Sequence, residues 1–337
     1  MHYRSFRIFF TLFFAVSVCI LIIAYSVGVV SRTQAHGIAP RSASSAVTSG
    51  LLKQDQTKVL AYWTLARMQS AHSADELLAN ATFTKPPTQR GGSGVGAPVL
   101  PKHIGVALKI PHTSYSIYPY STVGKVFFTD PLTSLNYVCS GAAVNSTNLS
   151  VVDTAGHCVI NGGSSNDWYT NWVFCPQYFK GKTPYGCWTA RLLWSYGDWA
   201  YSGSFEDDFG DAVVNPNSYG NLVNVVGGTG WAYGQSASQS FTSFGYPAAY
   251  PFSGNFMYTC GPTSTKIVSG YDDGTVIAIT CNMTGGSSGG PWMISINSAF
   301  GYVNGHNDFK YTNDLKHMYS PYYDGDWYAV FNAAQSS

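Results

Sequence analysis

Two short stretches of the chain hold residues that could carry out nucleophilic catalysis. The first, residues 151–158, is a β-like run that ends in a histidine beside a cysteine. The second, residues 285–291, places two adjacent serines among glycines. A serine hydroxyl becomes a good nucleophile only when a neutral imidazole removes its proton, and the reaction needs backbone N–H groups aimed at the developing oxyanion. Because glycine allows this backbone approach, the two stretches together favour an acyl-transfer site over a plain flexible loop.

The segments around these stretches have the composition of short strands. From Val123 onward, β-rich runs alternate with Gly, Pro, Asn and Ser, without a repeat of fixed period. Residues 145–148 are typical of a hairpin loop, and residues 327–334 are the only later helix candidate. The predicted strands include residues 125–129, 137–144, 149–154, 188–196, 275–280 and 292–296. An all-β sandwich or barrel closed by a C-terminal helix is expected.

Composition limits the class of protein. The chain has 337 residues, enough for about two domains at roughly 150 residues each. Charged residues make up only 10% of it, with 18 Lys and Arg against 17 Asp and Glu. A nucleic-acid binder needs clustered basic residues to displace counterions from phosphates, so this class is excluded. The 35 glycines and 24 tyrosines favour strands joined by tight turns over long helices.

The N-terminus predicts export. Residues 8–30 form a 23-residue run without charge behind His2, Arg4 and Arg7, long enough to span a bilayer. A signal peptide has a shorter apolar region of roughly 7 to 15 residues, so cleavage and an uncleaved anchor both stay open. We therefore expect a signal peptide or membrane anchor over residues 1–35, and a protein that is secreted or tethered to the outer face of the membrane.

The next segment differs in character from the rest of the chain. It is rich in Ala, Ser, Gln and Gly and contains no cysteine. Residues 61–68 and 74–78 have apolar residues at helical spacing, which predicts a short amphipathic helix. Residues 89–96 are typical of a flexible linker or a cleavable joint. The sequence thus predicts a pro-region or linker over residues 36–104 and a folded domain over residues 105–337.

Cysteine usage agrees with export. Outside the apolar run the cysteines number six, an even count that in an exported chain predicts three disulfides, with fifteen possible connectivities. Pairing of sequence neighbours is the simplest of these. No two cysteines have the close, repeated spacing of a zinc site, so no metal is expected. The six are Cys139, Cys158, Cys175, Cys187, Cys260 and Cys281.

Both catalytic stretches resemble those of the trypsin-like, chymotrypsin-fold serine peptidases. The Thr-Ala-Gly-His-Cys of residues 154–158 is similar to the family's Thr-Ala-(Ala/Gly)-His-Cys, and the Gly-Ser-Ser-Gly-Gly-Pro of residues 286–291 to its Gly-Asp-Ser-Gly-Gly-Pro, in the family's order. The resemblance covers about residues 123–324 and is greatest to secreted microbial members related to glutamyl endopeptidases. Residues 62–68 resemble a motif of their pro-regions.

This resemblance implies a fold and a set of roles. The fold would be two packed antiparallel six-stranded β-barrels with the substrate cleft between them. His157 would be the general base, Ser288 the nucleophile, and the N–H groups of Gly286 and Ser288 the oxyanion hole. Cys139 and Cys158 resemble the family's disulfide beside the base. The same resemblance implies that Cys260 pairs with Cys281 near the nucleophile. Cys175 and Cys187 would then close a local loop. The family implies a monomer without a cofactor.

The third member of the triad must be a carboxylate that fixes the tautomer of the base. In the family this residue is an Asp followed by an aromatic residue, Gly or Ala, and an apolar strand. Asp208, followed by Phe209 and Gly210, is the best match, and Asp211 is the runner-up. The acids considered between the base and the nucleophile are Asp198, Glu206, Asp207, Asp208 and Asp211.

One departure from the family concerns activation. Ser287 stands where the family often has an Asp that pairs with a newly freed N-terminus. A neutral hydroxyl cannot form that ion pair. We therefore expect activation to work by removal of a covering pro-region.

The substrate pocket is another departure. By spacing from the nucleophile, Asn282 would lie near the base of the pocket, and residues 301–306 would supply the strand that pairs with substrate. Val303 takes the place of the His of glutamyl peptidases, with Asn304 beside it, and His306 lies about three residues beyond. No carboxylate is available there for Lys or Arg, and a preference for acidic residues is a hypothesis.

These observations predict an exported serine endopeptidase that acts on proteins or peptides through an acyl-enzyme. Activity should rise as His157 deprotonates, around the unperturbed pKa of roughly 6.5. The alternative is a catalytically inactive, protease-like binding module at the cell surface. An esterase is disfavoured because its nucleophile elbow would place the Ser before the His in the chain.

Overall fold

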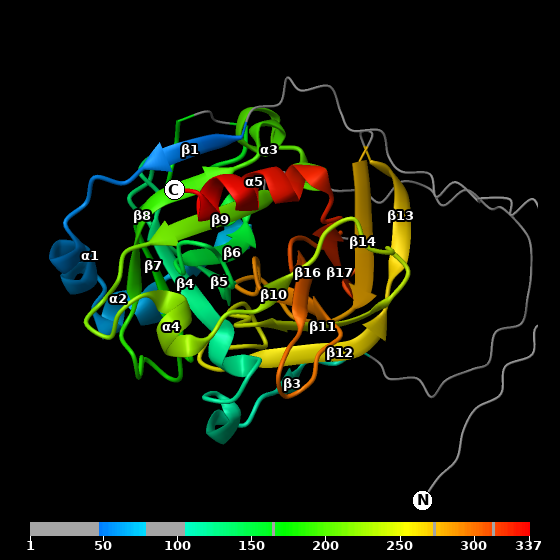
Figure 1. Ribbon diagram of the computed structural model, residues 1–337, viewed down its shortest axis with the longest axis horizontal. Coiled ribbons are helices and arrows are strands. Elements are labelled where there is room, and N and C mark those ends of the chain that lie inside the picture. The colour runs from blue at the N-terminus through cyan, green and yellow to red at the C-terminus, as the bar shows by residue number, and fades with distance from the viewer. Residues whose placement is uncertain (1–46, 79–104, 164–165, 272–273, 312–313) are drawn as a thin grey trace, which may run out of the picture. The chain divides into compact units, whose positions relative to one another are not determined.

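Strands dominate the part of the chain that the computed structural model describes, which covers residues 47–78, 105–163, 166–271, 274–311 and 314–337 (Figure 1). The predicted apolar run and glycine-rich linker lie outside these residues. No helix within the described ranges is long and apolar enough to cross a membrane.

The first half of the peptidase-like region is a closed barrel. Its six antiparallel strands follow the order β8-β7-β4-β5-β6-β9, and β9 pairs with β8 to close it. In β4 alternate side chains face opposite ways, so Val126 and Phe128 join the barrel core while Val123 and Phe127 join a second apolar cluster. The strands are β4 (Val123–Thr129), β5 (Asn136–Val144), β6 (Val151–Ala155), β7 (Thr170–Pro176), β8 (Trp188–Ser195) and β9 (Phe209–Val214).

The second half is built from two sheets. One has the order β10-β16-β15-β11-β12-β3 and the other β13-β14-β17; β10 and β16 are parallel, and the remaining neighbours are antiparallel. The chain passes between the sheets at Thr265, which separates β12 from β13. The strands are β3 (Leu108–Lys109), β10 (Gly230–Trp231), β11 (Ser240–Gly245), β12 (Tyr258–Ser264), β13 (Lys266–Tyr271), β14 (Gly274–Thr280), β15 (Pro291–Ile294), β16 (Tyr302–His306) and β17 (His317–Pro321).

The expected all-β fold with a C-terminal helix is confirmed, with one difference in detail. The hydrogen-bonded strands of the second half do not form a single six-stranded ring, because the bend at Thr265 divides them between the two sheets. Helix α5 (Gly325–Gln335) is capped by Asp324 and buries Trp327 and Phe331. It lies over β8 and β9 of the barrel (Figure 1). Two further short helices are α3 (Gly197–Ser202) and α4 (Leu222–Val226).

Residues 47–78 pack on the first barrel. Strand β1 (Thr48–Leu51) pairs with β8, and β2 (His72–Ser73) pairs with β5. The amphipathic helix predicted across residues 61–78 is wrong. The structure instead has two short helices and one 3-10 turn, because Asp55 and Thr64 each cap a separate helix start. These elements are α1 (Gln56–Tyr62), α2 (Leu65–Ser70) and η1 (Ala74–Glu76).

Three disulfides join the expected cysteine pairs. Each pair consists of sequence neighbours, and each closes a loop within one half of the fold: Cys139–Cys158, Cys175–Cys187 and Cys260–Cys281. The pairing that the family resemblance implied is therefore confirmed. Disulfides persist in oxidising compartments, so they are consistent with an extracellular location.

Candidate active site

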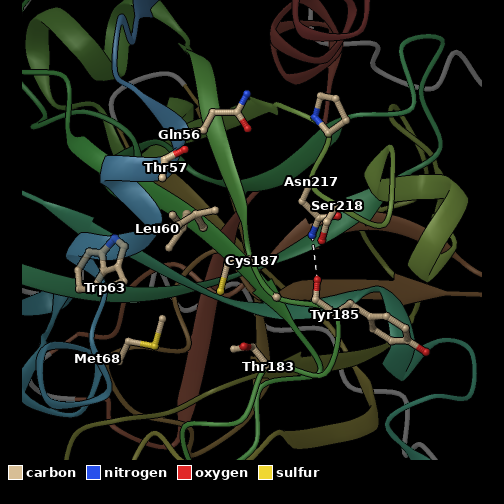
Figure 2. Close-up of a pocket in the computed structure, with 13 residues that line it drawn as sticks. Gln56, Thr57, Leu60, Trp63, Met68, Thr183, Tyr185, Cys187, Asn217 and Ser218 are labelled. Atoms are coloured by element: carbon tan, nitrogen blue, oxygen red, sulfur yellow. Dashed lines mark hydrogen bonds between the residues drawn. The ribbon is translucent and has the colours of Figure 1, made fainter.

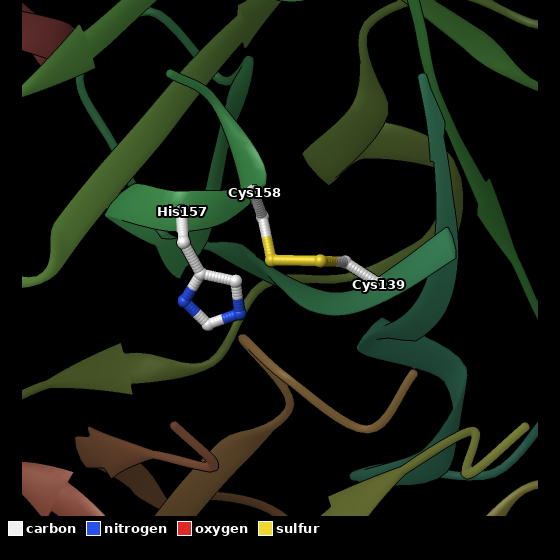
Figure 3. A group of neighbouring side chains, drawn as sticks. All are labelled: Cys139, His157 and Cys158. Atoms are coloured by element: carbon white, nitrogen blue, oxygen red, sulfur yellow. A yellow bond between two sulfur atoms is a disulfide. The ribbon is translucent and has the colours of Figure 1, made fainter. Parts of the chain in front are cut away.

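His157 lies in a 3-10 turn, η4 (Gly156–Cys158), that directly follows strand β6. The next residue, Cys158, is bonded to Cys139 on the neighbouring strand β5. Figure 3 shows the imidazole beside this disulfide. The sulfur atoms lie close enough to His157 to suggest a metal cluster, but as a disulfide they are not free thiolates. The disulfide thus fixes the turn that holds the imidazole, whose residue is only 1% exposed.

Asp208 meets His157 through the register of two strands. Because Ala155 of β6 pairs with Phe209 of β9, the residues beyond this pair, Gly156 and Asp208, also lie side by side. The carboxylate accepts two hydrogen bonds from His157, one from the backbone N–H at 2.6 Å and one at 2.7 Å from Nδ1. A Cβ at Gly156 would lie 2.6 Å from Asp208 Oδ1, so this contact requires glycine.

The other acids considered lie elsewhere. Asp211 is opposite Asp153 in the β6–β9 pair, two residues along each strand from the pair Ala155–Phe209 that adjoins His157. Asp198 belongs to α3, and Glu206 and Asp207 belong to the 3-10 turn η5 (Phe205–Asp207). The structure therefore brings Asp208 to the imidazole, the residue that the sequence favoured over Asp211.

Ser288 lies in the glycine-rich loop between β14 and β15. This loop is tied to the first barrel by Ser140, whose N–H donates to Ser288 O at 2.7 Å and whose Oγ donates to Gly286 O at 2.9 Å. Gly286 has a φ of +89°, a conformation that favours glycine. In the described part of the chain, the N–H groups of Gly286 and Ser288 donate no hydrogen bond. Neither N–H is therefore committed to an acceptor among the described residues.

The Ser288 hydroxyl faces the N-terminal segment. Its Oγ donates to Asp75 Oδ1 at 2.7 Å, and the carbonyl oxygen of Asp308 lies 3.5 Å from it. Among the described residues, Nε2 of His157 has no hydrogen-bond partner. The serine is therefore hydrogen-bonded to a carboxylate of residues 47–78 instead of to the imidazole.

Asp308 adds a second carboxyl group to the site. It follows β16, is buried, and places Oδ1 3.4 Å from Nδ1 of His157. Neither Asp75 nor Asp308 was singled out in the sequence. Both lie outside the two catalytic stretches, and the only available signal for Asp308 was its position two residues beyond the predicted substrate strand.

Comparison with known proteins decides the family. No family model and no curated protein matches the chain. A structure search matches the protease Anisep of Arthrobacter nicotinovorans, at 38% identity over 64% of this chain and 96% of that one, with a TM-score of 0.59. The chain belongs to the trypsin-like serine peptidases. A thermostable serine protease, AL20, from an extremophilic microorganism matches at 34% identity over 67% of this chain and 100% of its own, with a TM-score of 0.60.

A Glu endopeptidase in complex with MPD shares the fold. It matches at 17% identity over 68% of this chain and 97% of its own, with a TM-score of 0.54. The predicted relation to glutamyl endopeptidases within the serine peptidases is thus confirmed at the level of fold.

Burial and charge act against each other at the peptidase site. Burial lowers the pKa of His157, but the charge and hydrogen bond of Asp208, with a contribution from Asp308, outweigh burial and raise this pKa well above 6.5. Burial raises the pKa of Asp208, while its contacts with His157 and Asp308 lower it below the usual value. The resting arrangement is an ionised Asp208 beside an imidazole of raised basicity.

The residues expected in the substrate pocket have other partners. Val303 is fully buried in the apolar cluster beneath α5. Asn304 donates to Ala232 O at 2.8 Å and accepts from Gln239 at 2.9 Å. Asn282 accepts from the backbone N–H of Ala107 at 2.6 Å. Within the described part of the chain, Val303 and Asn304 are buried and Asn282 is exposed.

His306, also considered from the sequence, is fully buried, and its Nδ1 lies 2.9 Å from the hydroxyl of Tyr323. Burial lowers the pKa of His306 to about 3. It is therefore a neutral, internal histidine.

A cavity of about 480 Å³ lies on the side of the N-terminal segment. It is lined by Leu60, Trp63 and Met68 of the N-terminal segment and by loops of the first barrel, where Asn217 donates to Tyr185 O at 2.8 Å (Figure 2). None of its lining residues is His157, Asp208 or Ser288. The cavity belongs to the contact between residues 47–78 and the barrel.

Proposed function

We propose that this serine peptidase is an exported endopeptidase that cleaves peptide bonds through Ser288, His157 and Asp208. The observation that supports it most directly is the pair of hydrogen bonds from His157 to Asp208, at 2.6 and 2.7 Å, beside the Ser288 loop. Asp208 accepts the Nδ1 proton and so leaves Nε2 as the base.

The reaction follows from these positions. Once the hydroxyl of Ser288 turns to Nε2 of His157, the imidazole takes its proton as the oxygen attacks the peptide carbonyl. The N–H groups of Gly286 and Ser288 bind the resulting oxyanion. The imidazolium then protonates the leaving amine, and water hydrolyses the acyl-enzyme by the same steps in reverse order.

We further propose that the protein is made in a latent form. Residues 36–104 would be a pro-region, and its described part, residues 47–78, would cover the site. Release of the apolar N-terminal run by cleavage, or its retention as an anchor, both agree with export.

The part of the pro-region that resembles the family motif supports this proposal through its docking contacts. Trp63 is 6% exposed, packs against Phe127 with ring centroids 5.3 Å apart, and donates from Nε1 to Asn171 O at 2.6 Å. Arg67 donates to the carbonyl at the end of α1 at 2.8 Å, and Met68 is buried. These contacts attach residues 62–68 to the barrel, as expected of an anchor for a pro-region.

Beyond this anchor, the chain runs to the nucleophile. Strand β2 lies along β5, and Ala74 is fully buried. This arrangement brings the next residue, Asp75, to Ser288 Oγ. A carboxylate at this place accepts the hydrogen bond of the serine hydroxyl, so that the hydroxyl does not donate to the imidazole. Its negative charge also repels the oxyanion that forms during attack. Latency would therefore follow from the hydrogen bond between Asp75 and Ser288.

A fluorophosphonate probe, which reacts only with an activated serine, tests the proposed chemistry. We would treat the full exported chain, map the adduct by mass spectrometry and measure peptide turnover. The comparison variants are Ser288→Ala and, as a matched control in the same loop, Ser287→Ala, whose side chain only donates to Thr284 O at 2.8 Å.

An adduct on Ser288 that persists in Ser287→Ala and is lost in Ser288→Ala is the expected result. Absence of labelling and turnover, even in an Asp75→Ala variant, would favour a catalytically inactive binding module.

A further inference from the structure

The backbone beside Asp308 is held more firmly than an ordinary loop. The amide of the preceding residue, Asn307, accepts from Ser243 at 2.6 Å and from Trp292 at 2.8 Å, and donates to Phe244 O at 2.9 Å. The backbone N–H of Asp308 itself donates to Tyr319 O at 3.0 Å. The direction in which the Asp308 side chain points is therefore determined by the fold.

That side chain points at the triad. Asp308 Oδ1 is 3.4 Å from His157 Nδ1, and one carboxyl oxygen of Asp308 lies within 4.8 Å of one of Asp208. Neither oxygen of Asp308 accepts a hydrogen bond from a described residue. The carbonyl oxygen of the same residue lies 3.5 Å from Ser288 Oγ. Asp308 thus lies next to all three residues of the proposed triad, and all four residues are at most 1% exposed.

Two buried carboxyl groups cannot both stay ionised beside one imidazole, because uncompensated charge is costly to bury. The charged one is Asp208, which accepts both N–H donors of His157. Burial first, and then the charge of Asp208, raise the pKa of Asp308 well above its usual value. The titratable groups that face Asp308 are His157 and Asp208. His306, at the end of the strand β16 that leads to Asp308, is neutral and contributes no charge.

We infer that Asp308 is a positioning residue of the triad, whose neutral carboxyl group donates a hydrogen bond to Asp208 and holds that carboxylate against His157. Asp208 then has three donors, two from His157 and one from Asp308. The third donor spreads the negative charge of Asp208 and restricts its rotation. This inference rests on the proposed peptidase function, since it assigns a role within the same site.

Two substitutions separate a donor role from simple packing. Asp308→Asn keeps an N–H donor of the same shape, whereas Asp308→Ala removes the donor. Should the alanine variant fail to fold, as judged by thermal unfolding, Asp308→Leu replaces it, with a similar volume and no donor. The matched control is Asp211→Asn, which neutralises another fully buried acid on β9 that does not contact His157.

The rate of fluorophosphonate labelling of Ser288 is measured in the full chain from pH 5 to 9. We expect Asp308→Asn and Asp211→Asn to label within roughly threefold of the native rate, and Asp308→Ala to label more slowly by a factor on the order of ten, the effect of losing one hydrogen bond to a charged group. The acid limb of the pH profile should be the same in Asp308→Asn and the native chain.

A second readout does not depend on reactivity. The Nδ1 proton of His157 gives a strongly downfield proton NMR signal when it is held in a short bond to a carboxylate. We expect this signal in the native chain and Asp308→Asn, and its broadening or loss in Asp308→Ala.

Each opposite result overturns the inference. An acid limb that moves to lower pH in Asp308→Asn would mean that Asp308 is ionised, and native labelling with a native signal in Asp308→Ala would mean that the donor is unnecessary. If neither the native chain nor the Asp75→Ala variant labels or cleaves peptides, the proposed function fails, while the NMR comparison still tests the Asp308–Asp208 bond.

Discussion

Asp75→Ala should accelerate the labelling of Ser288 while the N-terminal segment remains attached. The native hydroxyl donates to Asp75 Oδ1 at 2.7 Å, a distance typical of a strong hydrogen bond to a charged acceptor. To react, the serine must leave this carboxylate and turn to His157. The labelling rate of the full chain therefore depends on the population in which the bond is broken.

The size of the effect follows from the bond. Hydrogen bonds to charged groups contribute about 1.5–3 kcal/mol, and each 1.4 kcal/mol changes an equilibrium about tenfold. Asp75→Ala should therefore raise the rate by about 10- to 150-fold. Asp75→Asn keeps a neutral acceptor, worth about 0.5–1.5 kcal/mol, and should raise the rate by a smaller factor, on the order of five to ten.

The assay compares labelling rates at a fixed probe concentration, with intact mass spectrometry to verify that residues 47–78 are still present. Glu76→Ala is the matched control. Its carboxylate is adjacent in sequence, but the side chain is 60% exposed and is bonded to His72 at 3.0 Å rather than to Ser288. We expect this variant to label at the native rate.

Two results would refute this reasoning. Labelling of Asp75→Ala at the native rate would show that the carboxylate does not limit access to the serine. Equal acceleration in Glu76→Ala would show that both substitutions merely loosen the segment.

Three further predictions concern the anchor, the interior and the base. Trp63→Ala removes an indole packed on Phe127 and should weaken the docking of residues 47–78 by about 3–5 kcal/mol. Limited proteolysis should then digest residues 47–78 while the barrel resists. Continued protection of this segment would contradict the role of Trp63 as an anchor. Asp211 lies opposite Asp153, and burial raises the pKa of both, that of Asp153 to about 7. Because the folded acids bind protons that the unfolded chain has released, stability should fall from about pH 4 through 7 and above; urea titration at pH 5 and 8 should find this loss smaller in Asp211→Asn by more than about 1 kcal/mol. The acid limb of kcat/KM should lie above pH 6.5, since the pKa of His157 is raised, and a midpoint at or below 6.5 would contradict the contribution of Asp208.

Much of the fold was predictable because its signals are local. The strands around the catalytic stretches and the C-terminal helix were found close to their observed bounds, since alternation and turn residues act over a few positions. The helix predicted over residues 61–78 was wrong, because apolar spacing alone does not reveal that Thr64 starts a new helix. The division of the second half into two sheets depends on long-range pairing, which the local pattern does not specify.

By itself, the sequence determined the family resemblance, the cysteine pairing it implied, and the place of His157 and Ser288, since each depends on a few adjacent residues whose backbone must serve the chemistry. It also favoured Asp208, which the β6–β9 register brings to His157. Only the tertiary structure brought Asp75 to Ser288 across 213 positions of sequence and turned Asp308 toward His157. Such contacts depend on strand register and on the packing of distant segments, and a buried carboxyl group has no local pattern that shows which charge it will meet.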